Sequence, residues 1–217
     1  MSWAEIKRAV NSTVGTEKFV PLNKFVESLM EEFSYEMAAT NADIFGDAGG
    51  AVLVVPRMEV IPSNEYYYRN MVRAILPPGL KKIGNSAFSS CDQLRGVNIP
   101  DSVIEIGNSA FSSCSSLRNV KLPDQITKIE DETFEGAALS SIIIPNKVET
   151  IGARAFALCS DLETITIPKS VTQIGSSAFS QTALKDVYYN GTQEEWNNIQ
   201  IGTENYVLTN ATIHYNS

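Results

Sequence analysis

Few side chains in this sequence of 217 residues are of a type that could carry out chemistry. His214 is the single histidine, and no serine or cysteine motif accompanies it to complete a pair of nucleophile and base. The sequence also lacks a phosphate-binding glycine loop, a paired-histidine zinc pattern and a calcium-binding EF-hand loop. We therefore predict a protein that is not an enzyme, with no catalytic residues, no metal ligands and no cofactor.

Three cysteines remain as candidates for a metal site or a disulfide. Cys91, Cys114 and Cys159 each lie three residues after a phenylalanine, in equivalent positions of similar segments. Equivalent positions line up along a repeat instead of converging on one metal ion, so we predict buried thiols. A bridge between Cys91 and Cys114 stays open, because neighbouring strands are only about 4.8 Å apart. The odd number of cysteines fits a reducing compartment better than a disulfide framework.

The segments around these cysteines are copies of one repeat. The block Ile-Gly-Xaa-Xaa-Ala-Phe recurs with small variations every 22 or 23 residues, and a weaker copy at residues 61–66 has tyrosine in place of phenylalanine. This spacing predicts a solenoid of six coils. The glycine suits a tight turn, and the aromatic side chains should stack from coil to coil as a spine of the core. The predicted spine residues are Tyr66, Phe88, Phe111, Phe134, Phe156 and Phe179.

Each coil also contains a short predicted strand that runs into a turn. In one coil Leu94, Val97 and Ile99 are apolar and the residues between them are spacers, which is typical of a strand with one buried face. Pro100 then ends the strand pairing, because proline has no N–H group to donate. Repetition of this pattern predicts parallel strands stacked along the solenoid.

These repeats resemble the BspA-like leucine-rich repeats of bacterial surface and hypothetical proteins, over roughly residues 55–189. Five close copies of a patterned block make the resemblance specific. It implies an α/β fold, namely a right-handed leucine-rich-repeat solenoid with a parallel sheet on one face. It also implies a binding role, because some similar proteins act as adhesins or bind host proteins.

The two ends of the chain differ from the repeats. Ser2 and Glu5 form a capping box for a short helix, and an apolar stripe at residues 25–37 predicts a second helix. This stripe is expected either to pack on the first coil or to form a homo-oligomer or docking contact. Thr192 and Glu195 form another capping box, and residues 211–215 alternate like a last strand. We expect a helical segment and linker at residues 1–50, a solenoid of about six coils at 51–190 and a C-terminal cap at 191–217.

The spacers between the apolar strand residues should face the open surface of the sheet. The first half of this surface is then basic, and three apolar residues point outward. Arginine and aromatic residues are the types that most often carry interface energy. We predict that this surface binds a protein with an acidic patch, and a merely solvated sheet face is the alternative. The predicted partner-binding residues are Arg73, Ile75, Arg95, Asn98, Arg118, Lys121, Ile143, Thr166 and Tyr188.

Charge and hydropathy narrow the partners and the location. The 17 basic and 25 acidic residues give a net charge of −8, which argues against binding to nucleic acid. The longest apolar run, at residues 51–56, is far shorter than the roughly 20 residues that cross a membrane. The N-terminus lacks the pattern of a secretion signal, so we expect a cytoplasmic protein. The alternatives are a phage or prophage accessory protein that inhibits a host protein, and an adhesin or glycan-binding protein that reaches the cell surface by another route.

Overall fold

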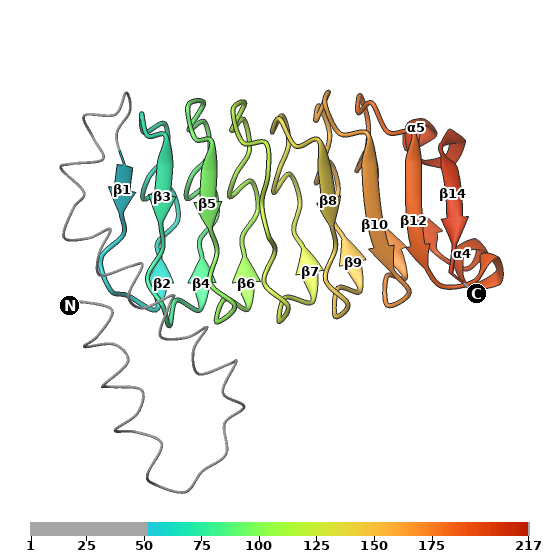
Figure 1. The fold of residues 1–217 in the computed structure, drawn as a ribbon, viewed down its shortest axis with the longest axis horizontal. Helices are drawn as coiled ribbons and strands as arrows, with labels where there is room; N and C mark the ends of the chain where they lie inside the picture. The colour runs from blue at the N-terminus through green and yellow to red at the C-terminus, as the bar shows by residue number, and fades with distance from the viewer. Residues whose placement is uncertain (1–51, 217) are drawn as a thin grey trace, which may run out of the picture. The chain divides into compact units, whose positions relative to one another are not determined.

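The structure, a computed structural model, describes residues 52–216. The helices predicted near the N-terminus and the linker before residue 51 lie outside the described residues. Figure 1 shows the described chain as a row of coils in which strands of neighbouring coils lie side by side, with an interruption between β5 and β8. All strand pairs between coils are parallel, so the predicted parallel-sheet solenoid is confirmed.

One line of strands forms the sheet that the apolar alternation predicted. It has two parts, with the strand orders β1-β3-β5 and β8-β10-β12-β14. In β3 and β8 the middle residue, Ala74 or Ile142, is buried and its two neighbours are more exposed. The strands are β1 (Val52–Val54), β3 (Arg73–Ile75), β5 (Gly96–Asn98), β8 (Ser141–Ile143), β10 (Thr164–Pro168), β12 (Asp186–Asn190) and β14 (Thr212–Tyr215).

A second line of two-residue strands was not predicted from the sequence. It also has two parts, ordered β2-β4-β6 and β13-β11-β9-β7. The second residue of each strand is an isoleucine, which is buried or half-buried and so holds the strand against the core. The strands are β2 (Val60–Ile61), β4 (Lys82–Ile83), β6 (Glu105–Ile106), β7 (Lys128–Ile129), β9 (Thr150–Ile151), β11 (Gln173–Ile174) and β13 (Gln200–Ile201).

Turns, and not helices, connect the second line of strands to the sheet. Ser86 and Ser90 have left-handed φ angles of 53° and 59°, and each coil has two left-handed residues at the same spacing of four positions. In this backbone conformation every second N–H group of the turn points to the next coil. Ser86, Phe88 and Ser90 donate to carbonyls of that coil at 2.7 to 2.8 Å. These bonds offset the backbone strain of about 1 kcal/mol or more per left-handed residue.

Helix is therefore scarce in the described part of the chain. Among residues 52–216 it is limited to α4 (Gln193–Asn197) and α5 (Tyr206–Asn210), both near the C-terminus. The predicted α/β class is corrected to a fold made mostly of strands, because hydrogen bonding between coils takes the place of hydrogen bonding within a helix.

The predicted aromatic spine is confirmed. Neighbouring rings from Tyr66 to Phe179 stack with centroids 5.2 to 5.7 Å apart, and the four contacts between phenylalanines have interplanar angles of 1° to 14°. The five phenylalanines are fully buried. The ring centroids are spaced slightly wider than the roughly 4.8 Å between hydrogen-bonded strands, so one aromatic residue per coil can form a continuous stack.

The three cysteines are free and buried beside this spine, as predicted, and Cys91 and Cys114 form no bridge. Each thiol donates to a spine carbonyl of the preceding coil; the Sγ–O distance from Cys114 to Phe88 is 3.2 Å and that from Cys159 to Phe134 is 3.1 Å. Burial raises the pKa of the Cys159 thiol to about 12 and also raises the pKa of Cys91 and Cys114. The thiols are therefore protonated and unreactive in the folded protein.

The recurring glycine has a different role from the predicted tight turn. A Cβ atom on Gly84 would lie 2.6 Å from Ser63 N of the preceding coil, and one on Gly152 would lie 2.6 Å from Asp131 N. Such distances are too short for a carbon atom. Glycine is needed here because the backbones of two coils approach closely, and the left-handed φ falls two residues later.

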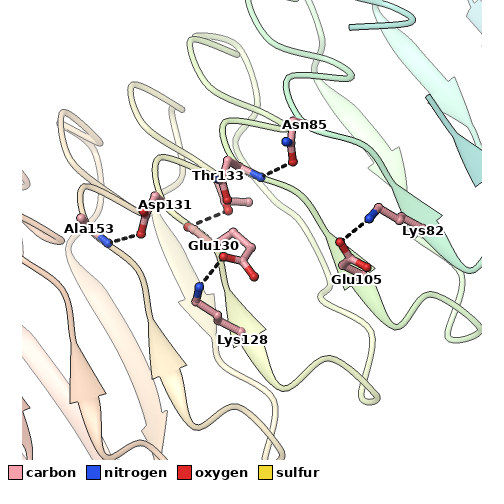
Figure 2. Close-up of polar contacts among 9 residues, drawn as sticks. Lys82, Asn85, Glu105, Lys128, Glu130, Asp131, Thr133 and Ala153 are labelled. Atoms are coloured by element: carbon pink, nitrogen blue, oxygen red, sulfur yellow. Dashed lines mark hydrogen bonds and ion pairs between the residues drawn. The ribbon is translucent and has the colours of Figure 1, made fainter. Parts of the chain in front are cut away.

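One coil has Glu130 in the glycine position, and the strand pairing stops there. Within residues 52–216, β6 does not pair with β7 in the second line of strands. In the sheet, β5 does not pair with β8, and no strand is assigned between them. Glu130 has a Cβ at the position where Gly107 and Gly152 approach the preceding coil closely, while the turn bonds remain, with Ser109 N donating to Asp131 O at 2.9 Å. Figure 2 shows Lys128 directed at the Glu130 carboxylate, and the turn contacts continue beyond the break, with Asp131 Oδ1 accepting from Ala153 N at 2.8 Å.

The C-terminal residues follow the last regular coil. The predicted capping box is confirmed, since Thr192 Oγ1 accepts from Glu195 N and Glu195 accepts from Thr192 N at the start of α4. The predicted last strand is β14, which pairs with β12. Asn205 is buried, and its Oδ1 accepts from Phe179 N at 3.1 Å, where another coil would supply a backbone carbonyl. The backbone carbonyl of Asn205 instead accepts from Thr209 N in α5.

Substitution of Gly152 tests the close approach of the coils. We expect Gly152→Ala to lower the free energy of unfolding by about 1–3 kcal/mol, because the added Cβ meets backbone that must move. Gly96→Ala is the matched control, since a Cβ there would meet no atom within 4 Å; its effect should stay within roughly 0.5 kcal/mol. Urea unfolding of both variants measures the difference, and equal stabilities would contradict the close-approach role.

The buried thiols predict a loss of stability at high pH. The unfolded chain loses thiol protons near the ordinary pKa of 9.0, whereas folded Cys159 keeps its proton to about pH 12. The free energy of unfolding should therefore fall between these values, by up to about 1.4 kcal/mol per pH unit for this thiol. Cys159→Ala should have a shallower slope than the parent protein in urea titrations over this range, and Ser115→Ala should not. An unchanged slope in Cys159→Ala would contradict the assignment.

Candidate functional site

The nine predicted binding residues all lie on one surface of the sheet. We call this surface the outward sheet face and define it as the first and third residues of each strand in the sheet, with the residue before each strand and their equivalents in residues 118–121. Arg95 comes directly before β5, and Arg95 N donates to Val72 O, the equivalent position of the preceding coil. Arg118 and Lys121 are exposed in the segment without an assigned strand.

The third strand positions form the most continuous line on this face. The register of β3 and β5 sets Ile75 opposite Asn98, and that of β8, β10 and β12 sets Ile143, Thr166 and Tyr188 side by side. Ile143 is 72% exposed and Tyr188 is 46% exposed. Two large apolar side chains are thus presented to solvent by a sheet whose opposite side is fully packed.

His214 continues this line and was not predicted as part of the site. The pairing of β12 with β14 sets it opposite Tyr188, and the two rings stack with centroids 4.8 Å apart. His214 Nε2 lies 2.7 Å from Asp186 Oδ1. The alternation of residues 211–215 already predicted a last strand, so the same register rule could have placed His214 on this face.

A groove opens on the face where the strand pairing is interrupted. It has a volume of about 490 Å³ and is lined by residues 119–122, 124, 141–143 and 145. Leu122 and Ile142 are buried in its floor, and Ile143 is exposed at its wall. The sequence reasoning missed this groove, although the glutamate in a glycine position and the shorter 22-residue repeat both marked the coil as irregular.

The basic residues in the first half of the outward sheet face differ in their ion pairs. Within residues 52–216 no carboxylate pairs with Arg73 or Arg95, while Arg118 Nη1 lies 3.8 Å from Asp161 Oδ2. Lys121 Nζ contacts Asp101 at 3.2 Å. The basic side chains do not form a single line, because Arg95 and Arg118 precede the strand positions and Arg73 lies within a strand.

Two acidic residues lie past the ends of the strand segments in this half of the face. Asp101 and Asp124 follow the prolines that end successive strand segments, so they lie past the opposite ends of those segments from Arg95 and Arg118. The basic first half of the outward sheet face is therefore bordered by acidic residues past one end of its strand segments.

The geometry is suited to binding and offers little for catalysis. In the described part of the chain no hydroxyl or thiol group bonds to His214, and no three metal-ligating side chains cluster. The thiols are buried with raised pKa values. None of the helices between residues 52 and 216 has the length and apolar character needed to cross a membrane.

Comparisons with known proteins agree with the repeat architecture. The family model for the BspA type leucine rich repeat region matches six copies over residues 59–185. No curated protein matches the chain at a significant level.

Several solved structures resemble the chain. A leucine rich cell surface protein of Faecalibacterium prausnitzii is 35% identical over 70% of the chain, with a TM-score of 0.57. A leucine-rich repeat protein of Eubacterium ventriosum is 26% identical over 55% of the chain, with a TM-score of 0.51. The leucine rich repeat protein of T. pallidum, at 24% identity over 70% of the chain and 72% of its own length, shares the fold with a TM-score of 0.61.

The chain spans only part of the first two of these proteins. It covers 38% of the Faecalibacterium protein and 32% of the Eubacterium protein. Because the family model matches more than half of the sequence, with repeats and a spine that the structure places in register, the chain belongs to the BspA-type leucine-rich repeat family.

Proposed function

We propose that this chain is a non-catalytic scaffold that binds another protein through the outward sheet face. The observation that carries the proposal is the presence of exposed Ile143 and Tyr188 on the same face as Arg73 and Arg95, which pair with no carboxylate among residues 52–216. Isolated apolar residues are common on surfaces, but tyrosine and arginine presented together on a fixed frame are typical of binding sites.

The rigidity of the frame favours this function. Strand pairs and turn bonds link the strands of successive coils, so the backbone under these side chains is already ordered before a partner arrives. Less conformational entropy is lost on binding when the contact residues are fixed in advance. Each exposed side chain can then contribute more of its contact energy to affinity.

An acidic patch on the partner would complement the arginine edge, which we define as Arg95 and Arg118. Guanidinium groups form paired hydrogen bonds with carboxylates, and Arg95 and Arg118 occupy equivalent positions in successive coils. Nucleic acid is a poor alternative, because the chain has a net charge of −8 and acidic residues stand along the other edge.

The proposal also includes the ends and the hand of the solenoid. We expect a right-handed solenoid, with residues 191–217 covering the last coil so that its unpaired backbone groups do not pair with other molecules. The bonds of buried Asn205 and the pairing of β14 support this covering role.

A variant of the outward sheet face tests the function. Arg95→Glu, Arg118→Glu and Tyr188→Ala together should abolish capture of a partner from a lysate of the source cells, as identified by mass spectrometry. With the purified partner, the dissociation constant should rise at least tenfold, which corresponds to about 1.4 kcal/mol, because the variant removes attractive charges and an aromatic contact.

The matched control carries the same changes away from this face. Lys81→Glu, Lys147→Glu and Tyr206→Ala alter the charge by the same amount and remove one exposed tyrosine. This control should keep the partner. Equal retention by both variants, with unchanged thermal unfolding, would rule out the outward sheet face as the binding surface.

Display at the cell surface is a second candidate, favoured by the 35% identity to a protein described as a cell surface protein. The partner would then be a molecule outside the cell instead of one in the cytoplasm. Protease treatment of intact source cells separates the two locations, since only a displayed chain is cleaved. The phage or prophage alternative gains no support from the similarities.

A further inference from the structure

The groove and the arginine edge lie next to each other in the outward sheet face. Arg118 immediately precedes Asn119, which lines the groove. Ser140 occupies the equivalent position in the next coil and immediately precedes Ser141, which also lines the groove. A ligand that fills the groove therefore comes within about one residue length, roughly 3.5 Å, of the Arg118 backbone.

The groove itself is suited to an apolar side chain. Leu122 and Ile142 form a buried apolar floor, and Ile143 adds an exposed apolar wall. Asn119 and Ser141 supply polar groups at the rim. Apolar lining with a few polar rim groups is the usual composition of a site that orients one buried group of a ligand.

The charges around the groove have a direction. Arg95 and Arg118 lie before the strand segments, and Asp101 and Asp124 lie after them. The ion pair of Arg118 with Asp161 is long at 3.8 Å and largely exposed, so it competes weakly with a new carboxylate. Lys121 already contacts Asp101. An anionic group is therefore attracted to the arginine side of the groove and repelled from the aspartate side.

We infer that the groove binds an extended acidic peptide segment of a partner protein. One large apolar side chain of the segment enters the groove, and carboxylates on one side of that residue pair with Arg95 and Arg118. Residues on the other side of the apolar anchor are neutral or basic, because they lie toward Asp101 and Asp124. This inference rests on the proposed function and specifies the partner's chemistry.

Selection from random twelve-residue peptides displayed on phage tests the inference. The full chain is the target, and the Arg95→Glu, Arg118→Glu variant is used to remove peptides that bind elsewhere. Enriched peptides should contain Leu, Ile, Phe, Met or Trp with Asp or Glu concentrated on one side of it. The strongest peptide is then synthesised with a fluorescent label and titrated by anisotropy.

Three variants give the expected pattern in these titrations. Arg95→Glu with Arg118→Glu should weaken binding at least tenfold and reduce its dependence on salt, and the uncharged substitution Ile143→Asn should also weaken it at least tenfold with little change in salt dependence. Lys81→Glu with Lys147→Glu should leave the affinity within twofold. All substituted residues are exposed, and thermal unfolding checks that the variants remain folded.

The inference is overturned if no peptide is enriched, if the enriched peptides lack acidic residues, or if binding survives both face variants. These outcomes differ from failure of the proposed function. Should a protein partner be lost by the triple variant of the outward sheet face while peptides behave in one of these ways, the face binds a folded surface and not an extended segment. Retention of the partner by the triple variant would instead remove the proposed function.

Discussion

The structure depends on each coil lying within backbone hydrogen-bonding distance of the next. The rings of the spine, with centroids 5.2 to 5.7 Å apart, can stack only if neighbouring coils lie this close. The same holds for the hydrogen bonds that the turns donate to the next coil. The same spacing leaves no room for a side chain at the position of Gly84 or Gly152. Residues with left-handed φ are accepted in every coil because they direct N–H groups across the gap.

The candidate site arises where this constraint is relaxed. Glu130 stands in the glycine position, the coil that follows Phe134 is one residue shorter, and both lines of strands are interrupted at this coil. The spine nevertheless continues through the interruption, with Phe111 and Phe134 rings 5.6 Å apart. The core therefore holds the coils together while the surface opens into a groove, which separates the residues that maintain the fold from those free to bind.

Sequence reasoning predicted the features that repeat and missed those that depend on contact between coils. The repeat spacing predicted the spine and the buried cysteines, because equal positions in equal coils must align. Apolar alternation located the sheet but gave no sign of two-residue strands such as β4, whose pairing involves few side chains. The glycine was recognised, yet its reason could only be seen once Ser63 and Gly84 were close in space. The groove was missed because residues 119–122 and 141–143 come from different coils, and the pattern of one coil does not describe the space between two.

The side chain of Asn205 has a consequence for how such a protein can change in length. It accepts from Phe179 N in place of a further coil, and it frees its own carbonyl for the helix that leads the chain away. In the turns between residues 62 and 181, each coil donates from the same positions to the same positions of the next coil. Duplication or deletion of a whole repeat upstream therefore leaves the terminus chemically unchanged. The extent of the surface can thus evolve in steps of one coil, independently of the residues that end the array.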